Sequence, residues 1–292
     1  MKVYLMIING LGIGPLPDSS KYSKIKTNTL GNVCRDLPLA TLNAIGLMNV
    51  YGVLSDEYPN AVSTIARVRM ITNRVGYNYG IDEILGNIID YDNEKPITHN
   101  MIDMLRDFGY NVLSIGDSSF DVDIPISKDK DIADFVFNSN GMDYDVLIAV
   151  MNGFFRTKCT NSTDRLKRYL VSVDNYCRSV INKMEKDDLF ILVGNQGVDT
   201  LNKCASREYS PIVVFTKRAP EYKNLGTVQG LDCVAMTILD YLNVYNNDKS
   251  LLPQKELVKS DRKNNVGLLK KAFSPVLKNS KNKMLELNTF ED

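Results

Sequence analysis

The sequence is poor in histidine, in net charge and in long apolar runs. Its 292 residues include one histidine, His99, and 35 basic residues balance 35 acidic ones. A chain without net charge has no overall field that attracts nucleic acid or a membrane surface, so no nucleic-acid partner is expected. No apolar run approaches the roughly 20 residues of a transmembrane helix, which excludes a membrane-spanning helix as an expectation. A lone histidine also excludes a histidine-rich metal centre.

The five cysteines are scattered and have no CxxC or CxxH spacing. Met1 and Lys2 lead directly into an apolar run, so no signal peptide is expected. Reduced thiols and a cytoplasmic location are the corresponding interpretation.

Apolar runs alternate with amphipathic segments along most of the chain. Strands are predicted over 3–8, 62–71, 111–115, 145–150, 189–193 and 211–215, and helices over 28–35, 98–108, 129–138, 163–184 and 231–242. Residues 38–53 are expected to be rich in loops, and 76–86 to form a loop or short helix. This order predicts an α/β fold with three layers, a mostly parallel sheet with helices on both faces.

The composition changes near residue 245. Residues 246–292 contain ten lysines and arginines against six acidic residues, a net charge of +4, and apolar residues become sparse. The expected organisation is a core over 1–244 and a lysine-rich extension over 245–292. Two interpretations of the extension stay open: a solvated segment that packs loosely on its own domain, and a docking segment for another protein, with an acidic surface or lipid as lesser options.

The opening stretch carries the most specific pattern. The apolar run Val3–Ile8 ends at Asn9, and Gly10, Gly12 and Gly14 follow within five residues. Ligands of open α/β sheets bind at the carboxyl ends of the strands, so this tip is a candidate site.

The stretch from Asn9 to Asp18 resembles the Asp-Ser-x-Gly-Ile-Gly-x-x-Pro-Asp segment of phosphopentomutases, which belong to the alkaline phosphatase superfamily. Collinear similarities follow at 28–31, 42–50, 186–197 and 207–211. The last of these resembles the Arg-Glu-Tyr-x-Pro segment of that family. The resemblance spans residues 1 to about 244 and implies an alkaline-phosphatase-like core.

That resemblance also implies where functional residues would lie, and each such position differs here. Members of the family hold two divalent metals, usually manganese, with Asp and His, and carry a phosphate on a threonine. The positions that the resemblance assigns to the metal ligands and to the threonine hold other side chains in this chain: Asn9, Tyr77, Gly153, Lys158, Asn195, Gln196 and Ala205. Tyr77 stands at the position of the threonine. After Gly86 this chain also has too few residues to form the large cap domain of phosphopentomutases.

Amides at such positions need no metal to balance their charge, whereas crowded carboxylates repel one another. We therefore expect no metal and no cofactor, and Asn9, Asn195 and Gln196 are expected to hydrogen-bond to one another. His99, on a predicted helix outside these motifs, is interpreted as structural.

Three functional hypotheses follow. The leading one is a catalytically inactive phosphopentomutase-like protein with a structural, scaffolding or protein-interaction role, including self-association. The second is a metal-independent sensor of a sugar phosphate or nucleotide, with Asn9, Lys158 and Arg207 as anion-binding residues; whether any small molecule binds stays open. The third is a remodelled enzyme that uses Tyr77, Lys158 or Cys204 at the same edge of the sheet.

Overall fold

The computed structural model describes residues 1–50, 61–86, 100–117, 120–157, 163–218, 222–245 and 248–252. The fold outlined below is that of these residues. His99, Lys158, Cys159 and residues 253–292 of the predicted extension lie outside them.

A mixed sheet forms the centre of the fold, with strand order β10-β2-β9-β6-β1-β5-β3-β4. Neighbouring strands are parallel except at β9, which runs antiparallel to both β2 and β6. The mostly parallel α/β sheet predicted from the sequence is confirmed. Its strands are β1 (Val3–Asn9), β2 (Thr64–Arg69), β3 (Val112–Gly116), β4 (Ile124–Pro125), β5 (Val146–Met151), β6 (Leu189–Asn195), β9 (Ser210–Thr216) and β10 (Lys223–Gln229).

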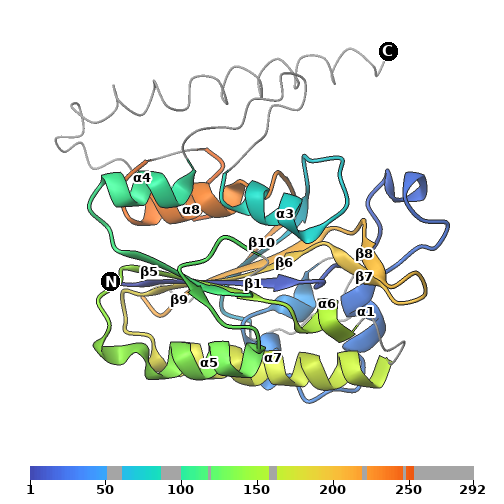
Figure 1. The fold of residues 1–292 in the computed structure, drawn as a ribbon, viewed down its shortest axis with the longest axis horizontal. Helices are drawn as coiled ribbons and strands as arrows, with labels where there is room; N and C mark the ends of the chain where they lie inside the picture. Colours follow the sequence, from blue (N-terminus) through green and yellow to red (C-terminus); the bar gives the residue numbers. More distant parts are fainter. Residues whose placement is uncertain are drawn as a thin grey trace, which may run out of the picture.

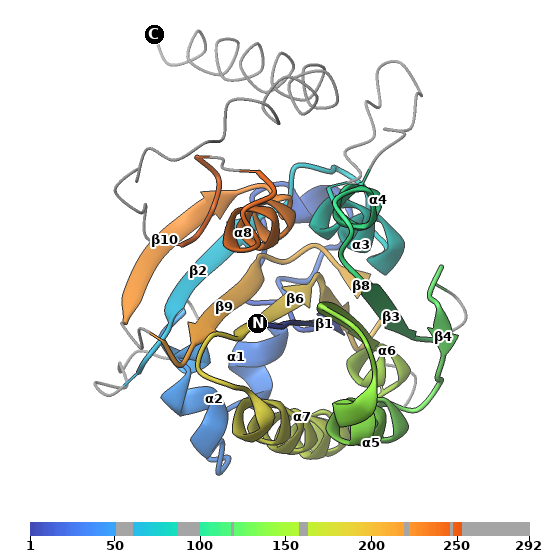
Figure 2. The ribbon, with the colours of Figure 1, turned by 90° about the vertical axis from the view of Figure 1, so that its left-hand side faces the viewer.

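Helices cover both faces of this sheet, as expected (Figures 1 and 2). One layer contains α1 (Thr29–Val33), α2 (Ala40–Ala44), α5 (Asp129–Asn138), α6 (Gly153–Thr157) and α7 (Thr163–Lys183). The opposite layer contains α3 (Tyr77–Ile84), α4 (Met101–Asp107) and α8 (Cys233–Tyr241). Single turns of 3-10 helix occur at η1 (Ser19–Lys21), η2 (Leu47–Asn49) and η3 (Ser139–Gly141).

Strand β1 contributes to the apolar packing on both faces, because side chains alternate along a strand. Tyr4, Met6 and Ile8 belong to the cluster beneath α7, whereas Val3, Leu5 and Ile7 belong to the cluster beneath α8. Each fully buried aliphatic side chain contributes about 1.5–3 kcal/mol relative to exposure. Packing on both faces of β1 therefore fixes the position of Asn9 at the end of this strand.

Polar residues set the starts of two helices near the sheet edge. The Asn28 side chain accepts a hydrogen bond of 3.1 Å from the Gly31 amide at the start of α1. Asn100 and Asp103 form a reciprocal capping box at the start of α4. Such caps satisfy amides that have no partner within the helix and contribute about 1 kcal/mol each.

Several elements differ from the sequence-based expectation. The segment 38–53, expected to be rich in loops, contains α2 and η2, whereas the short helix α3 within 76–86 is one of the two expected alternatives. Strand β10 and a small hairpin of β7 (Gly197–Asp199) and β8 (Cys204–Ser206) were not predicted. Among the described residues, no helix is both long and apolar enough to cross a membrane.

Candidate functional site

The tips of β1 and β6 meet at the carboxyl edge of the sheet, because the two strands pair in parallel with Asn9 opposite Asn195. Both asparagine side chains are fully buried. The Asn195 Nδ2 donates to Asn9 Oδ1 over 2.7 Å, and the Asn9 Nδ2 donates to Asn152 Oδ1 over 2.7 Å. Three amides from β1, β6 and the end of β5 thus form a chain of hydrogen bonds, here called the amide network.

Helix α3 covers this network. The Asn195 Nδ2 also donates to the Tyr77 carbonyl over 2.7 Å. The Asn195 Oδ1 has no hydrogen-bond donor and faces Gly80, where an added Cβ would lie 1.7 Å from that oxygen. Only glycine leaves room for α3 to approach this closely.

Gln196 does not join the two asparagines, in contrast to our expectation. Its backbone φ is +55°, which turns its side chain toward the loop before α3. There the Gln196 amide exchanges two hydrogen bonds of 3.0 Å with the backbone N–H and carbonyl of Gly76. A side chain that satisfies both backbone groups of one residue fixes the start of α3 over the tip of β6.

Tyr77, at the predicted nucleophile position, is buried and hydrogen-bonded. Its hydroxyl donates to the Gly197 carbonyl over 3.1 Å, and its ring packs edge-on against Phe155 with centroids 5.0 Å apart. Burial, and secondarily the Glu208 charge, raises the pKa of this phenol well above its usual value. A phenol held neutral in this way is a poor nucleophile.

Gly153 lies where a side chain would collide with Tyr169, since an added Cβ would come within 1.9 Å of that ring. The Asp129 carboxylate accepts hydrogen bonds from the Gly153 amide at 2.7 Å, from the Asn152 amide at 3.0 Å and from the Tyr169 hydroxyl. The amides that begin α6 are therefore already bound to a carboxylate of this chain.

Sequence reasoning missed the role of Glu208, although the Arg-Glu-Tyr-x-Pro segment contains it. This fully buried carboxylate accepts hydrogen bonds from the Thr29 amide at 2.8 Å, the Thr29 hydroxyl at 2.8 Å and the Ser206 hydroxyl at 2.6 Å. Burial raises its pKa, and these hydrogen bonds oppose that shift. Ala205, another predicted position, pairs with Val198 in the hairpin of β7 and β8.

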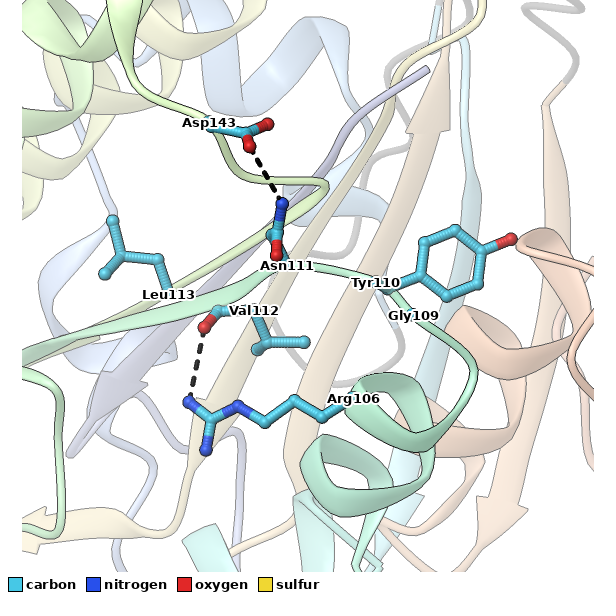
Figure 3. A pocket seen from close by; sticks show the side chains of 7 residues that line it. All are labelled: Arg106, Gly109, Tyr110, Asn111, Val112, Leu113 and Asp143. Carbon is cyan, nitrogen blue, oxygen red and sulfur yellow. Dashed lines mark hydrogen bonds between the residues drawn. The ribbon is translucent and has the colours of Figure 1, made fainter.

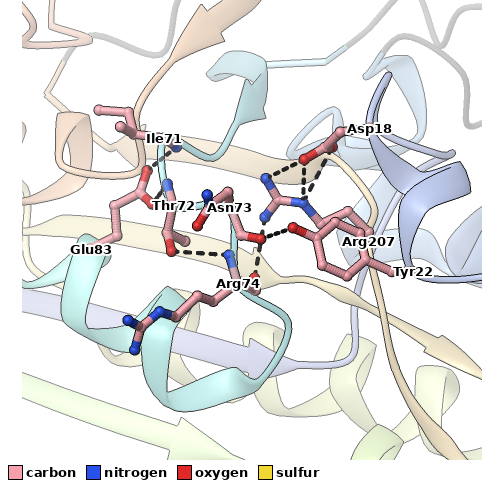
Figure 4. A network of polar contacts seen from close by, with 8 residues as sticks. All are labelled: Asp18, Tyr22, Ile71, Thr72, Asn73, Arg74, Glu83 and Arg207. Carbon is pink, nitrogen blue, oxygen red and sulfur yellow. Dashed lines mark hydrogen bonds and ion pairs between the residues drawn. The ribbon is translucent and has the colours of Figure 1, made fainter. Parts of the chain in front are cut away.

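A second polar cluster joins the loops above this edge (Figure 4). The Arg207 guanidinium binds the Asp18 carboxylate at 3.0 Å and donates to the Arg74 carbonyl at 3.3 Å. The Tyr22 hydroxyl donates to the Asn73 carbonyl. These contacts tie the loop that contains η1 to the loop between β2 and α3.

Glu83 of α3 anchors the same inter-element loop from below. Its carboxylate accepts from the Ile71 amide at 2.8 Å, the Thr72 amide at 3.0 Å and the Leu231 amide at 2.8 Å. Burial raises the pKa of Glu83, and the three backbone hydrogen bonds oppose the shift.

The predicted anion-binding residues do not present free donors at a common surface. Asn9 is enclosed in the amide network, and the Arg207 side chain is 4% exposed and paired with Asp18. Lys158 lies outside the described residues. Anion binding by this set stays a prediction, and the pairing of Arg207 disfavours it because a second anion would have to displace Asp18.

The donor set at the sheet edge does not fit a pair of divalent metals, which prefer carboxylate or imidazole ligands. Within the described residues no group of three or more His, Cys, Asp and Glu side chains could hold a metal ion. The carboxylates that follow β3 have separate partners: Asp117 pairs with Arg156, and Asp123 pairs with Arg106 and Ser114.

Two hollows in the described surface lie away from the amide network. One of about 480 Å³ is lined by residues around the start of β3, where Arg106 donates to the Val112 carbonyl and Asn111 to Asp143 (Figure 3). Another of about 440 Å³ lies between α3, α4 and the end of β3, with Ile7 and Val150 among its lining residues. Asn9, Asn195 and Gln196 line neither of them.

Comparisons with known proteins point to the same family as the sequence motifs. A phosphopentomutase of Clostridium kluyveri is 24% identical over 168 residues, 52% of this chain and 42% of that protein. A phosphopentomutase of Acetivibrio thermocellus is 31% identical over 93 residues, which is 30% of this chain and 24% of that protein. The chain thus spans less than half the length of these curated relatives. No protein-family model matches it.

Solved structures resemble the fold. A protein of the alkaline phosphatase superfamily from Vibrio parahaemolyticus aligns with a TM-score of 0.54 and 10% identity over 90% of this chain and 71% of that one. The TAB5 alkaline phosphatase aligns with a TM-score of 0.51 and 10% identity over 83% of this chain and 97% of that one. The chain is therefore similar in sequence to phosphopentomutases over about half of its length, and its α/β fold resembles that of alkaline phosphatase superfamily structures.

Proposed function

We propose that this chain is a catalytically inactive phosphopentomutase-like protein that works as an interaction or scaffolding module. The observation that carries the proposal is the amide network, in which neutral side chains of Asn195, Asn9 and Asn152 are hydrogen-bonded in a chain at the buried strand tips. Phosphoryl transfer in this superfamily depends on metals that neutralise the transferring oxygens. Neutral, enclosed amides supply neither the charge nor an open coordination position.

The closure over the network supports the same proposal. Tyr77 and Gly80 of α3 lie directly on Asn195, and the Arg207–Asp18 pair ties the loops above. Access of a sugar phosphate to Asn195 would require α3 to move away from the tip of β6, which would break the hydrogen bonds of Asn195 to Tyr77 and of Gln196 to Gly76.

The test is an activity measurement on the full chain with manganese and pentose phosphates, beside the Clostridium kluyveri phosphopentomutase as a positive control. We expect no turnover in either direction of the mutase reaction, and no manganese-dependent shift in the unfolding temperature. Turnover by the purified chain that disappears in a Tyr77→Phe variant would overturn the proposal.

The interaction role has its own measurement. Light scattering on the full chain at several concentrations reports self-association, and affinity capture with defined candidate proteins reports other partners. The sensor hypothesis predicts instead that sugar phosphates or nucleotides raise the unfolding temperature at micromolar concentration. Such a shift would favour the sensor over the scaffold.

A further inference from the structure

A basic and apolar surface lies beside the closed strand tips. We call it the basic rim and define it by four exposed lysines and three exposed apolar side chains: Lys21, Lys24, Lys26, Lys203, Tyr22, Ile25 and Leu201. Leu201 is 70% exposed, Tyr22 45% and Ile25 38%. These residues come from the loop around η1 and from the turn between β7 and β8, which lie at the same end of the sheet (Figure 1).

Hydrogen bonds hold the two halves of the basic rim together. The Ser23 hydroxyl donates to Asp199 Oδ2 over 3.2 Å, and the Leu201 and Asn202 amides donate to Asp199 Oδ1 over 3.0 Å. The loop is also tied to the β2–α3 loop through Tyr22 (Figure 4). The surface is therefore ordered before any partner arrives, which lowers the entropy lost on binding.

Two acidic groups near the basic rim are already engaged among the described residues. Asp18 binds Arg207, and Asp199 binds Ser23 and Asn202. Among the described residues, no ion pair joins Lys21, Lys24, Lys26 or Lys203 to a carboxylate. Four ammonium groups around three apolar side chains favour an occupant that combines carboxylates with apolar residues.

The chain itself contains a segment of that chemistry. Residues 284–292 read MLELNTFED, with three acidic residues and four apolar ones and no basic residue. Residues 253–283, in contrast, contain nine basic and two acidic residues. The 31 residues after Leu252 can span up to about 100 Å when extended, which is enough to reach any part of the fold.

We propose that residues 284–292 dock on the basic rim, within one molecule or between two copies of the chain. Carboxylates of Glu286, Glu291 and Asp292 would approach the lysines, while apolar side chains of the segment cover Ile25 and Leu201. A nucleic acid matches the charge but offers no aliphatic contact to Leu201, and the excess positive charge of 253–283 cannot bind a basic surface. This docking proposal rests on the proposed interaction role and specifies a surface for it.

The test is carbodiimide cross-linking of the full chain, because this reagent forms an amide only between an ammonium and a carboxylate that are in contact. Mass spectrometry of the digested product identifies the joined residues. We expect cross-links from Lys24, Lys26 or Lys203 to residues 284–292, and their loss in about 1 M salt, where charges beyond 3 Å are screened. Monomer and dimer bands on a denaturing gel separate docking within one molecule from docking between copies.

A matched pair of variants controls for charge. Replacement of Lys24, Lys26 and Lys203 by Glu should abolish these cross-links, whereas the same replacement at the exposed Lys130, Lys186 and Lys223 should leave them unchanged. A further variant combines these three Lys→Glu substitutions of the basic rim with replacement of Glu286, Glu291 and Asp292 by Lys. Cross-links should return in this variant, now between the new lysines of 284–292 and the new glutamates of the basic rim. Cross-links of 284–292 only to other lysines, or binding of a labelled oligonucleotide or anionic vesicle that the basic-rim variant alone loses, would overturn the proposal. Neither outcome bears on turnover, so it leaves the proposed inactivity standing.

Discussion

Asn9→Asp is the substitution that probes most directly why the strand tip carries an amide. The Asn9 Oδ1 accepts from Asn195 and its Nδ2 donates to Asn152, each over 2.7 Å, at a fully buried position. A protonated carboxyl keeps both interactions, since its carbonyl oxygen accepts and its hydroxyl donates. An ionised carboxylate cannot donate to Asn152 Oδ1, and at this buried position the charged group also loses its hydration. We therefore expect the variant to match the parent protein at low pH and to lose stability at neutral pH.

The magnitude follows from proton linkage. An aspartate titrates near pH 3.9 in the unfolded chain, and full burial raises a carboxyl pKa by up to about 3–5 units. The folded variant then retains a proton that the unfolded chain releases, so its stability falls as pH rises above the unfolded pKa. The loss grows by about 1.4 kcal/mol per pH unit and reaches up to about 4 kcal/mol at pH 7. Rotation of the Asn152 amide can offer a donor to the ionised form, but neutral donors replace only part of the lost hydration.

The assay is urea unfolding of the parent and variant proteins at intervals between pH 4.5 and 8. Asn175→Asp, at an exposed position of α7, is the matched control and should show no comparable slope. Equal free energies of unfolding for Asn9→Asp and the parent at every pH would refute the reasoning, because they would mean that the strand tip is hydrated or holds a cation.

Two further substitutions test the packing around the network. Gly80→Ala should lower the free energy of unfolding by about 1–3 kcal/mol despite its better helix propensity, because the new Cβ would meet Asn195 Oδ1 at 1.7 Å; Gly141→Ala, with open space at Cβ, should be nearly neutral in the same urea titration. Glu83→Gln should destabilise by about 2–3 kcal/mol, because the amide oxygen can still accept from Ile71 and Leu231 but the amide nitrogen then faces the Thr72 donor. Because burial raises the folded-state pKa of Glu83, the contribution of this residue to the free energy of unfolding falls as pH rises above about 4.3. The destabilisation by Glu83→Gln should therefore be smaller at pH 7 than at pH 4.5. A larger effect at pH 7 would contradict a raised pKa.

The sheet was predictable where strands are buried on both faces. The runs that became β1, β5 and β6 are uniformly apolar, and all residues of these strands are buried. Strand β10 was missed because Lys223–Gln229 is a mostly exposed edge strand without apolar alternation. The hairpin of β7 and β8 was missed because strands of three residues have too short a pattern to recognise.

The sequence predicted the residues of the candidate site better than the contacts between them. Parallel strands with aligned tips bring Asn9 and Asn195 together, as the sequence indicated. The positive φ of Gln196 could not be inferred from residue type, and it redirects that side chain to Gly76. Asn152 supplies the third amide. The resemblance placed the metal-ligand position at the neighbouring Gly153, which has no side chain, and so did not indicate Asn152.

The loops beside the strand tips and the loop that carries most of the basic rim are joined by polar contacts. The Arg207 guanidinium holds Asp18 on one side and the Arg74 carbonyl on the other, and the Tyr22 hydroxyl bonds to the Asn73 carbonyl. Separation of the ion pair would leave the buried Arg207 guanidinium without its carboxylate partner, which opposes opening of these loops. The hydrogen bond from the Ser23 hydroxyl to Asp199 joins the same loop of η1 to the turn of β7 and β8. Under the proposed function, a site edge held in this way disfavours a small substrate and offers a preorganised surface to a larger partner.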